Sequence, residues 1–403
     1  MNKISINDFD YELPDERIAK FPLQQRDSSK LLIYDKGKIG HQPFSSLPNI
    51  INSNSLLVFN NTKVVRARIF FYKATGAQIE IFCLEPVLPG SYEQNFATTS
   101  ECIWNCTVGN LKKWKGEALK KEFVCDNIRD ELRVEKLSFG DLPLKLKFSW
   151  KSGLSFAQVM DACGTIPVPP YLKRESQEID SERYQTVYSK PEGSVAAPTA
   201  GLHFSNNIIQ ILKSKNVKTD EITLHVGAGT FKPVKTEFAN EHVMHSEHFF
   251  VEKTSILKIM EHLGNITAVG TTSARTLESL YWAGCKIKQN KNIKNLNIQQ
   301  FEPYENNLQI SVEESLQAVI NYLDDNSLTK LDATTQIMIL PEYKPKTVTR
   351  LITNFHQPKS TLLLLIAAFI GSDWRKAYDY ALKNDFRFLS YGDSSVLSLK
   401  ECD

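Results

Sequence analysis

The sequence predicts an α/β protein in which a larger mixed α/β domain carries an inserted small antiparallel β-barrel domain. At 403 residues the chain is longer than a usual single domain. Between about residues 64 and 150, short β-rich runs recur between turn-like stretches, as in small barrels or sandwiches. From about residue 156 onward, strands alternate with helices, as in α/β sheets. We therefore expect a discontinuous α/β domain over residues 1–60 and 151–403, and the β-domain over residues 61–150.

The individual elements follow from runs of apolar residues. Residues 1–60 predict mixed structure that ends in the strand LLVF at 56–59. The inserted segment contains the strand-like runs VVRARIFFY, AQIEIFCLEP, CIWNCTVG, ELRVEKLSF and LKLKFSW. Later strands are predicted at ITLHV, at ITAVG before the helical segment SARTLESLYW, and at TVTRLITNF before TLLLLIAAFI. The polar stretch 288–300 predicts a surface loop. In such a fold, ligand loops lie at the carboxyl ends of the strands.

Composition and charge narrow the class of protein. A net charge of +2 gives no global field for nucleic acid, so any RNA contact needs a local basic face. The N-terminus lacks the apolar segment of a signal peptide, and the apolar run 362–370 is too short to span a bilayer. Seven irregularly spaced cysteines favour a reducing compartment. Cys102 and Cys106 are not followed by a third cysteine at Gly109, so no iron–sulfur centre is predicted. We expect a cytoplasmic protein that binds no membrane.

The segment GSVAAPTAGLHF, residues 193–204, is almost free of charge and rich in small side chains. It has neither the alternation of a half-buried strand nor a helical stripe. Small residues such as Thr199 and Gly201 would let a ligand approach the backbone, and Gly201 can take a φ that other residues resist. His203 would then stand at a tight turn beside the ligand. The alternative is a buried loop that crosses the core.

The segment VGTTSARTLES, residues 269–279, predicts a strand, a glycine, a cluster of hydroxyls and a helix. Thr272 or Ser273 could cap this helix, whose free N–H groups favour an anion. Arg275 adds a guanidinium fork suited to a carboxylate. The alternative is an ordinary capped helix with a surface arginine.

A glycine turn, VGAGT, follows the strand ITLHV. It lacks the third glycine of a dinucleotide-binding motif. We interpret Gly227 and Gly229 as permitting close approach of a nucleoside, with His225 at the strand end pointing into the same turn. The alternative is that His225 is a hydrogen-bonded structural histidine.

His242, His245 and His248 are spaced by three residues. On a helical turn they could gather around a metal. The segment MHSEHFFVE also predicts a strand, in which His245 and Glu247 share one face and His248 takes the other. Because no further ligand with zinc spacing follows, we expect no metal and favour His245 and Glu247 as polar pocket residues.

The segment TNFHQPKSTLLLLIAAF places Asn354, His356 and Lys359 in a loop before a very apolar helix. Ser360 or Thr361 would cap this helix and hold the loop in place. This loop is a second candidate for catalysis.

Cations and one aromatic residue alternate in KKWK, residues 112–115. Lys112, Lys113 and Lys115 with Trp114 have the composition of a phosphate-tracking surface with a stacking residue. A solvated charged hairpin is the alternative. Arg66 and Arg68, in FNNTKVVRAR at the expected domain junction, are stronger candidates for RNA contact.

These motifs together resemble a known family. From FDYELPDERIAKFP through FNNTKVVRAR, IPVPPY, ERYQTVYS, GSVAAPTAGLHF, TLHVGAGTFKPV, MHSEHF, VGTTSARTLES and TNFHQPKST to SYGD, the chain is similar to the bacterial S-adenosylmethionine:tRNA ribosyltransferase-isomerases of queuosine synthesis. The resemblance implies a larger α/β domain with an inserted small β-barrel. It also implies transfer and isomerisation of the ribosyl part of S-adenosylmethionine onto 7-aminomethyl-7-deazaguanine at the tRNA wobble position. The products would be epoxyqueuosine-tRNA, adenine and methionine.

The resemblance also implies partners and residue roles. The partners are tRNA and S-adenosylmethionine, which is a co-substrate, and we expect no further cofactor and a monomer. The sulfonium acidifies the ribose C5′ protons, so a base of near-neutral pKa suffices. We expect His203 or His225 as this base and the methionine end at Thr272, Ser273 and Arg275. Asn354 and His356 would orient the ribose or the modified base.

Departures from the family pattern keep alternatives open. Pro341–Glu342 stands where the family has Pro-Gly, Gln357 replaces a leucine, and residues 306–332 lengthen the chain. A related S-adenosylmethionine-dependent transferase acting on another acceptor is therefore one alternative. A non-catalytic RNA- or nucleoside-binding paralogue is another, and a metal-dependent hydrolase built on His242–His248 is the third.

Overall fold

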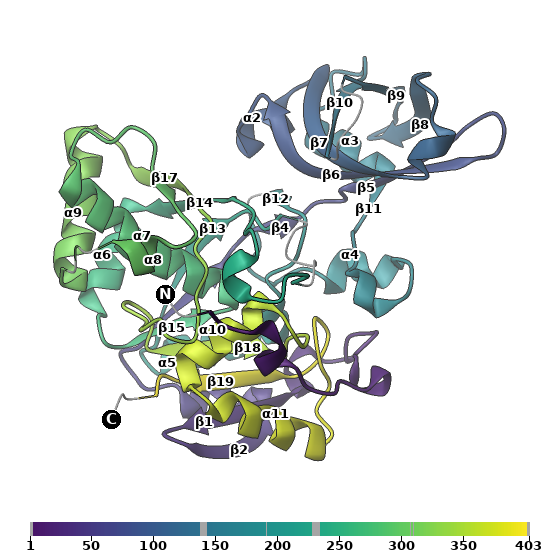
Figure 1. Cartoon of the computed structure of the whole chain (residues 1–403). Helices are drawn as coiled ribbons and strands as arrows, with labels where there is room; N and C mark the ends of the chain where they lie inside the picture. The colour runs from purple at the N-terminus through teal and green to yellow at the C-terminus, as the bar shows by residue number, and fades with distance from the viewer. Residues whose placement is uncertain are drawn as a thin grey trace.

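A ten-stranded mixed sheet forms the larger part of the protein (Figure 1). The structure is a computed structural model that describes residues 3–137, 143–190, 192–227, 234–306, 308 and 310–400. In spatial order the strands are β16 (Asn297–Ile298), β17 (Lys330–Thr335), β14 (Glu247–Glu252), β13 (Lys218–Leu224), β3 (Leu56–Asn60), β15 (Ile266–Val269), β18 (Arg350–Asn354), β19 (Ser394–Ser398), β1 (Lys30–Asp35) and β2 (Lys38–Pro43).

The centre of this sheet is parallel. Strands β13, β3, β15 and β18 run in the same direction, with Leu57 opposite both Thr219 and Thr267. Their carboxyl ends therefore meet at one edge of the sheet, where ligand sites of open α/β sheets are found.

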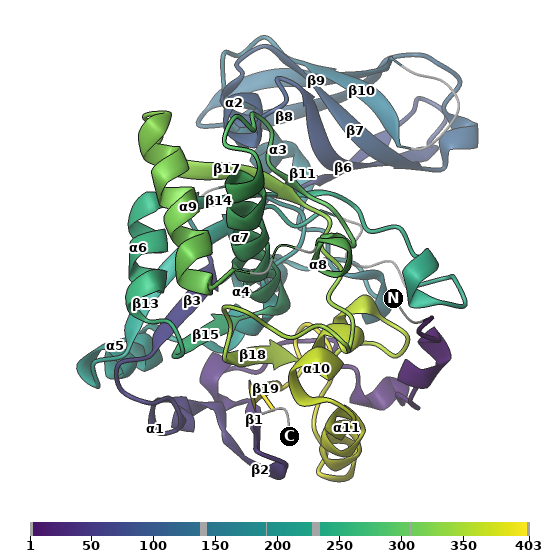
Figure 2. The same cartoon turned by 60° about the vertical axis from the view of Figure 1, so that its left-hand side comes forward.

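Alternate residues of the central strands face two separate cores. Leu56 and Val58 of β3 pack into the core that contains helices α7 (Thr271–Gln289) and α9 (Val312–Asp325). Leu57 and Phe59 pack into the opposite core with α1 (Leu47–Ile50) and α5 (Asn206–Ser214). Figure 2 shows α6 (Lys253–Glu261), α9 and α7 side by side over one face. The apolar helix α10 (Thr361–Ile370) is buried as predicted, next to α11 (Asp373–Lys383).

A second, seven-stranded antiparallel sheet forms a separate layer. Its strands, in spatial order, are β11 (Gly164–Thr165), β5 (Arg68–Tyr72), β6 (Gln78–Leu88), β7 (Glu101–Gly109), β10 (Leu144–Ser149), β9 (Ile128–Lys136) and β8 (Leu119–Cys125). The sheet curls, since Lys121 of β8 donates to the carbonyl of Phe70 of β5 at 3.2 Å. Its interior has its own apolar core, centred on Trp104 and Phe156.

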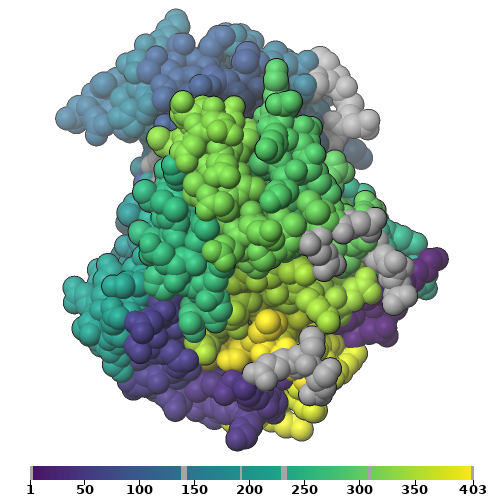
Figure 3. Space-filling model, turned by 90° about the vertical axis from the view of Figure 1, so that its left-hand side faces the viewer, coloured from purple at the N-terminus to yellow at the C-terminus, as the bar shows by residue number. Residues whose placement is uncertain are grey.

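Short elements join the two sheets. Strand β4 (Lys63–Val64) pairs with β12 (Glu192–Ser194) in a two-stranded ribbon at the junction (Figure 1). Helices α2 (Tyr92–Ala97) and α3 (Phe156–Cys163) belong to the seven-stranded side, and α4 (Glu178–Arg183) and α8 (Glu302–Glu305) are single short turns. In Figure 3 the blue atoms of the seven-stranded sheet lie directly above the green part of the chain that contains α7 and α9.

The alternation of strands and helices agrees with the sequence prediction, with three corrections. Strand β8 was not predicted, because LKKEFVC is interrupted by charges on its exposed face. The stretch 288–300 is not purely a surface loop, since Leu296 and Ile298 are buried and β16 pairs with β17. The seven-stranded sheet also includes β11, beyond residue 150. In the described part of the chain, no helix is long and apolar enough to cross a membrane.

Candidate functional site

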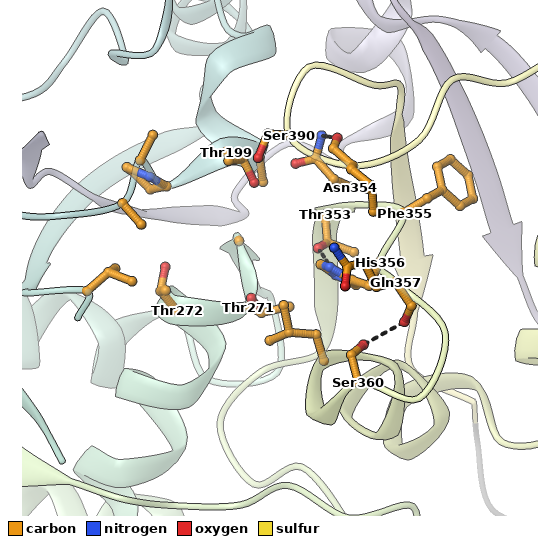
Figure 4. A pocket seen from close by; sticks show the side chains of 18 of the residues that line it. Thr199, Thr271, Thr272, Thr353, Asn354, Phe355, His356, Gln357, Ser360 and Ser390 are labelled. Carbon is orange, nitrogen blue, oxygen red and sulfur yellow. Dashed lines mark hydrogen bonds between the residues drawn. The ribbon is translucent and has the colours of Figure 1, made fainter. Parts of the chain in front are cut away.

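Two cavities lie at the carboxyl ends of the central strands. The larger, which we call the inter-sheet cleft, has a volume of about 670 Å³ and lies between the two sheets. It is lined by Arg68, Phe82, Glu85, Tyr92 and Thr107 from one side and by His225, Gly227, His245–His248 and Thr334 from the other. The smaller, which we call the inner cavity, has about 100 Å³ (Figure 4). Val226 lines the inner cavity while its neighbours His225 and Gly227 line the cleft, so the two cavities adjoin.

His225 packs against aromatic rings in the cleft. Its imidazole lies against the phenol ring of Tyr92, with centroids 4.3 Å apart and an interplanar angle of 20°. The ring of His248 lies nearly parallel to it, with the centroids 6.5 Å apart. Burial, and to a lesser degree the charge of His248, lowers the pKa of His225 to about 4. The imidazole is therefore neutral at pH 7.

Gly193 makes room for this arrangement. A Cβ at this position would stand 2.5 Å from two atoms of the His225 ring and 3.2 Å from Tyr92. The φ of Gly193 is 144°, which side chains rarely adopt. Only glycine fits beside the stacked pair.

Glu247 and His245 share one face of the strand region, as predicted. His245 Nε2 lies 3.1 Å from Glu247 Oε1. Burial alone would raise the pKa of Glu247, but the charge of Arg275 and the contact with His245 lower it to about 2. Glu247 is thus a buried carboxylate that faces Nε2 of His245 on one side and Arg275 on the other.

Arg275 differs from the sequence prediction. Its guanidinium is buried and forms an ion pair with Glu247, and its Nε donates to the carbonyl of Ile337 at 3.3 Å. The fork expected to hold a substrate carboxylate therefore binds a carboxylate of the protein. The sequence could not reveal this pairing, because helix α7 and strand β14 are brought together only by the sheet.

The three spaced histidines have different partners. MHSEHF leads into β14 rather than forming a helix, His245 contacts Glu247, and His248 Nε2 lies 2.6 Å from Asp332 Oδ1. The described residues contain no group of three or more His, Cys, Asp or Glu side chains arranged to hold a metal ion.

The start of α7 forms one wall of the inner cavity, and the capping prediction for it is wrong. The N-cap position is Gly270, with a φ of 94°. Ser273 instead donates to the carbonyl of Val269 at 2.8 Å and is fully buried. Within the described chain, no side chain caps this helix, and the buried Oγ1 of Thr272 has no hydrogen-bond partner.

The loop between β18 and α10 forms the opposite wall (Figure 4). Ser360 caps α10 as predicted, accepting a hydrogen bond from the Leu363 N–H at 3.3 Å. His356 lies 3.0 Å from the hydroxyl of Thr353, and burial lowers its pKa to about 3. It is a neutral lining residue.

His203 does not lie in either cavity, which corrects its expected role as a base. Both ring nitrogens are occupied: Nδ1 by the hydroxyl of Ser29 at 2.8 Å and Nε2 by the amide of Asn354 at 3.1 Å. Burial, with the charges of Arg387 and Arg26, lowers its pKa to about 3. His203 orients Asn354 from behind the inner cavity.

The predicted small residues have mixed positions. Thr199 lines the inner cavity. Gly201 has no positive φ, and its missing Cβ makes room for the hydroxyl of Tyr188, so packing and not ligand approach explains it. Gly227 lines the cleft. Gly229 lies outside the described residues.

The expected RNA-contacting residues lie on the seven-stranded side. Arg66 pairs with Asp161 at 3.0 Å and Arg68 with Glu80 at 3.1 Å, and Arg68 lines the cleft. Lys112, Lys113 and Lys115 are exposed. The stacking role expected for Trp114 is wrong: its ring is buried, Lys136 covers it at 4.4 Å, and its indole N–H donates to the backbone carbonyl of Glu117 at 2.6 Å.

Sequence reasoning missed Tyr92, Thr353 and Ser390, which line these cavities. For Tyr92 no signal was present, since an aromatic residue in a short polar helix is common. Thr353 and Ser390 are the first residues of the motifs TNFHQPKST and SYGD, so membership of these motifs was the available signal.

Comparison with known proteins gives a consistent assignment. The family model described as "Queuosine biosynthesis protein" matches residues 6–397. The chain is 37% identical to the S-adenosylmethionine:tRNA ribosyltransferase-isomerase of Sulfurihydrogenibium sp., over 98% of this chain and 100% of the relative. It is 36% identical to the protein of the same name from Francisella philomiragia, over 97% and 99%. A crystal structure of S-adenosylmethionine tRNA ribosyltransferase from Thermotoga maritima is 27% identical over 96% of this chain and 99% of that one, with a TM-score of 0.45. On the family match and these full-length relatives, the chain belongs to the queuosine biosynthesis protein family.

Proposed function

We propose that the protein is an S-adenosylmethionine:tRNA ribosyltransferase-isomerase. It transfers and isomerises the ribosyl part of S-adenosylmethionine onto 7-aminomethyl-7-deazaguanine at the tRNA wobble position, and epoxyqueuosine-tRNA, adenine and methionine result. The observation that carries the proposal is the inter-sheet cleft, where the imidazoles of His225 and His245 and the ion-paired carboxylate of Glu247 line a space of about 670 Å³. Such a space accommodates a nucleoside and an extruded base together.

The proton transfer falls to His245. The sulfonium acidifies the ribose C5′ protons, so the base needs only a pKa near neutrality. Glu247 accepts a hydrogen bond from the Nε2–H group of His245. Its negative charge stabilises the imidazolium that forms when Nδ1 of His245 takes the C5′ proton. Arg275 holds Glu247 ionised. His225, neutral and stacked on Tyr92, presents a flat polar surface to the nucleoside.

The tRNA is held by the seven-stranded side. We propose that residues 61–150 form the core of an inserted domain whose own apolar core keeps it rigid. Arg66, Arg68 and the exposed Lys112, Lys113 and Lys115 contact phosphates, and Phe82 and Tyr92 face the extruded base. The protein acts as a monomer in the cytoplasm, with S-adenosylmethionine as co-substrate and no metal, because the sulfonium itself supplies the activation.

Purified protein with S-adenosylmethionine and two tRNA preparations tests the proposal. One tRNA bears the aminomethyl-deazaguanine and the other carries guanine at the same position. We expect adenine and methionine to be released only with the modified tRNA, in equal amounts with the product nucleoside. Release with a different acceptor would favour a related transferase. Binding without any release would favour a non-catalytic paralogue.

A further inference from the structure

We propose that the inner cavity is an α-amino-acid subsite, which binds the carboxylate and ammonium groups of the methionine part of the substrate. The inference deepens the proposed function and rests on it for the choice of methionine. It keeps Thr272 of the expected methionine end, drops Arg275, which pairs with the protein's own Glu247, and adds Asn354 as the group that binds the ammonium.

The start of α7 supplies the groups that bind the carboxylate. The first N–H groups of an α-helix have no partner within the helix, and a buried helix start normally has them capped. The 19-residue helix α7 begins with Thr271 and Thr272 on the cavity wall and has Gly270, which carries no side chain, at its N-cap. With the helix dipole, these N–H groups and the Thr272 hydroxyl form an anion site.

Asn354 supplies the group that binds the ammonium. It is 3% exposed and lines the same cavity. Its Nδ2 donates to His203 Nε2 at 3.1 Å and to the carbonyl of Leu389 at 3.2 Å, which fixes the amide plane. Its Oδ1 is buried and has no hydrogen-bond partner among the described residues. A buried acceptor of this kind requires a donor, and a ligand ammonium is one.

The charge of the cavity selects a zwitterion over a simple anion. Of the residues that the structure describes, no Asp, Glu, Lys or Arg lines the inner cavity. Its histidine, His356, is neutral because burial lowers its pKa to about 3. A group with zero net charge, carrying one carboxylate and one ammonium, fits such a lining at a lower desolvation cost than a phosphate.

Size and position agree with this assignment. The cavity offers about 100 Å³, room for several water molecules and thus for an amino-acid end, not a nucleoside. Residues 225–227 lie between it and the inter-sheet cleft, so the proposal places the sulfur of a bound methionine beside this segment, toward the cleft. Figure 4 shows Thr199, Thr272, Asn354 and Ser360 around the open space.

Titration calorimetry on the wild-type protein tests the subsite without any tRNA. We expect L-methionine to bind, and methioninamide and the deaminated analogue of methionine each to bind at least about tenfold more weakly, since each loses one charged hydrogen-bonding group. Absence of L-methionine binding, equal binding of all three compounds, or competition by inorganic phosphate would overturn the inference.

The variant Thr272→Val tests the contribution of the Thr272 hydroxyl to the subsite. Removal of the hydroxyl should weaken L-methionine and S-adenosylmethionine binding about tenfold and leave methioninamide unchanged. Thr329→Val, an exposed and distant threonine, is the matched control and should bind like wild type. If Thr272→Val binds methionine like wild type while the wild-type enzyme turns over modified tRNA, the subsite is wrong and the proposed function stands. If methionine binds as expected but the wild-type enzyme does not turn over modified tRNA, the subsite stands and the proposed function is wrong.

Discussion

The phenol ring of Tyr92 lies almost parallel to the imidazole of His225, with centroids 4.3 Å apart. Tyr92 belongs to α2 on the seven-stranded side, and His225 follows β13 of the ten-stranded sheet. The pair therefore joins the two sheets at the wall of the inter-sheet cleft. Any shift between the sheets would change the position of the imidazole.

Tyr92→Ala should lower turnover and lower the free energy of unfolding by about 2 kcal/mol, because both the stacked pair and buried ring area are lost. Tyr92→Phe keeps the ring and loses only the hydroxyl, which donates to Leu84 at 3.3 Å. We expect it to retain most activity. Steady-state kinetics and urea unfolding measure both effects, and equal activity of the two variants would contradict the positioning role.

Gly193→Ala should reduce turnover, because the added Cβ would displace the His225 ring. Its Cβ would collide with the His225 ring at 2.5 Å, and its φ of 144° strains any side chain. We expect a loss of stability of about 1–3 kcal/mol together with weaker activity. Gly40→Ala, which has open space around it, is the control. Wild-type kinetics for Gly193→Ala would show that His225 is not constrained by this contact.

His245→Ala should lower turnover by about 10²–10⁴-fold while S-adenosylmethionine binding persists, because the proton acceptor is lost.

Glu247→Gln should also lower turnover, since it leaves Arg275 buried without a countercharge. Because the pKa of Glu247 is depressed to about 2 in the folded state, its stabilisation is complete above its unfolded pKa near 4.5 and is lost as the pH falls toward 2. The stability gap between wild type and Glu247→Gln, on the order of 3 kcal/mol at neutral pH, should close over that range. A gap independent of pH would contradict the ion-pair assignment.

Acid should destabilise the protein from about pH 6.5 downward. His203 and His356 are buried neutral with pKa values of about 3, and His225 with one of about 4, so unfolding takes up protons below their normal pKa of 6.5. Stability is therefore full above pH 6.5 and falls as the pH drops toward 4. His203→Gln should remove about one proton from the slope of unfolding free energy against pH, about 1.4 kcal/mol per pH unit. It should also reduce turnover far less than His245→Ala, and a comparable loss of turnover would restore His203 as a candidate base.

Replacement of Lys112, Lys113 and Lys115 with Ala should weaken tRNA binding and flatten its salt dependence. Each phosphate contact contributes about −0.7 to −0.9 to the log–log slope, so up to three such contributions disappear. S-adenosylmethionine affinity should not change. Replacement of the exposed Lys288, Lys291 and Lys294, which lie outside the seven-stranded sheet, is a charge-matched control. If both triple variants bind tRNA with the same affinity and the same salt slope, the 112–115 segment does not contact tRNA and is a solvated turn.

The sequence by itself determined the local structure and the motifs that line the cavities. The strand–helix units β15–α7 and β18–α10, the buried apolar helix and the Ser360 cap all follow from patterns within about 20 residues, because hydrogen bonding and side-chain periodicity are local. The strand character of MHSEHF and the shared face of His245 and Glu247 follow from the same period-two alternation.

The partners of the polar side chains were decided only by the tertiary structure. The Arg275 guanidinium suited a carboxylate, yet which carboxylate depended on β14 lying beside α7, 28 residues away. His203 had the chemistry of a base, but Ser29 and Asn354, 174 and 151 residues away, occupy both of its nitrogens. A side chain's chemistry is set by its own atoms, whereas its charge, orientation and access are set by neighbours that long-range packing brings together.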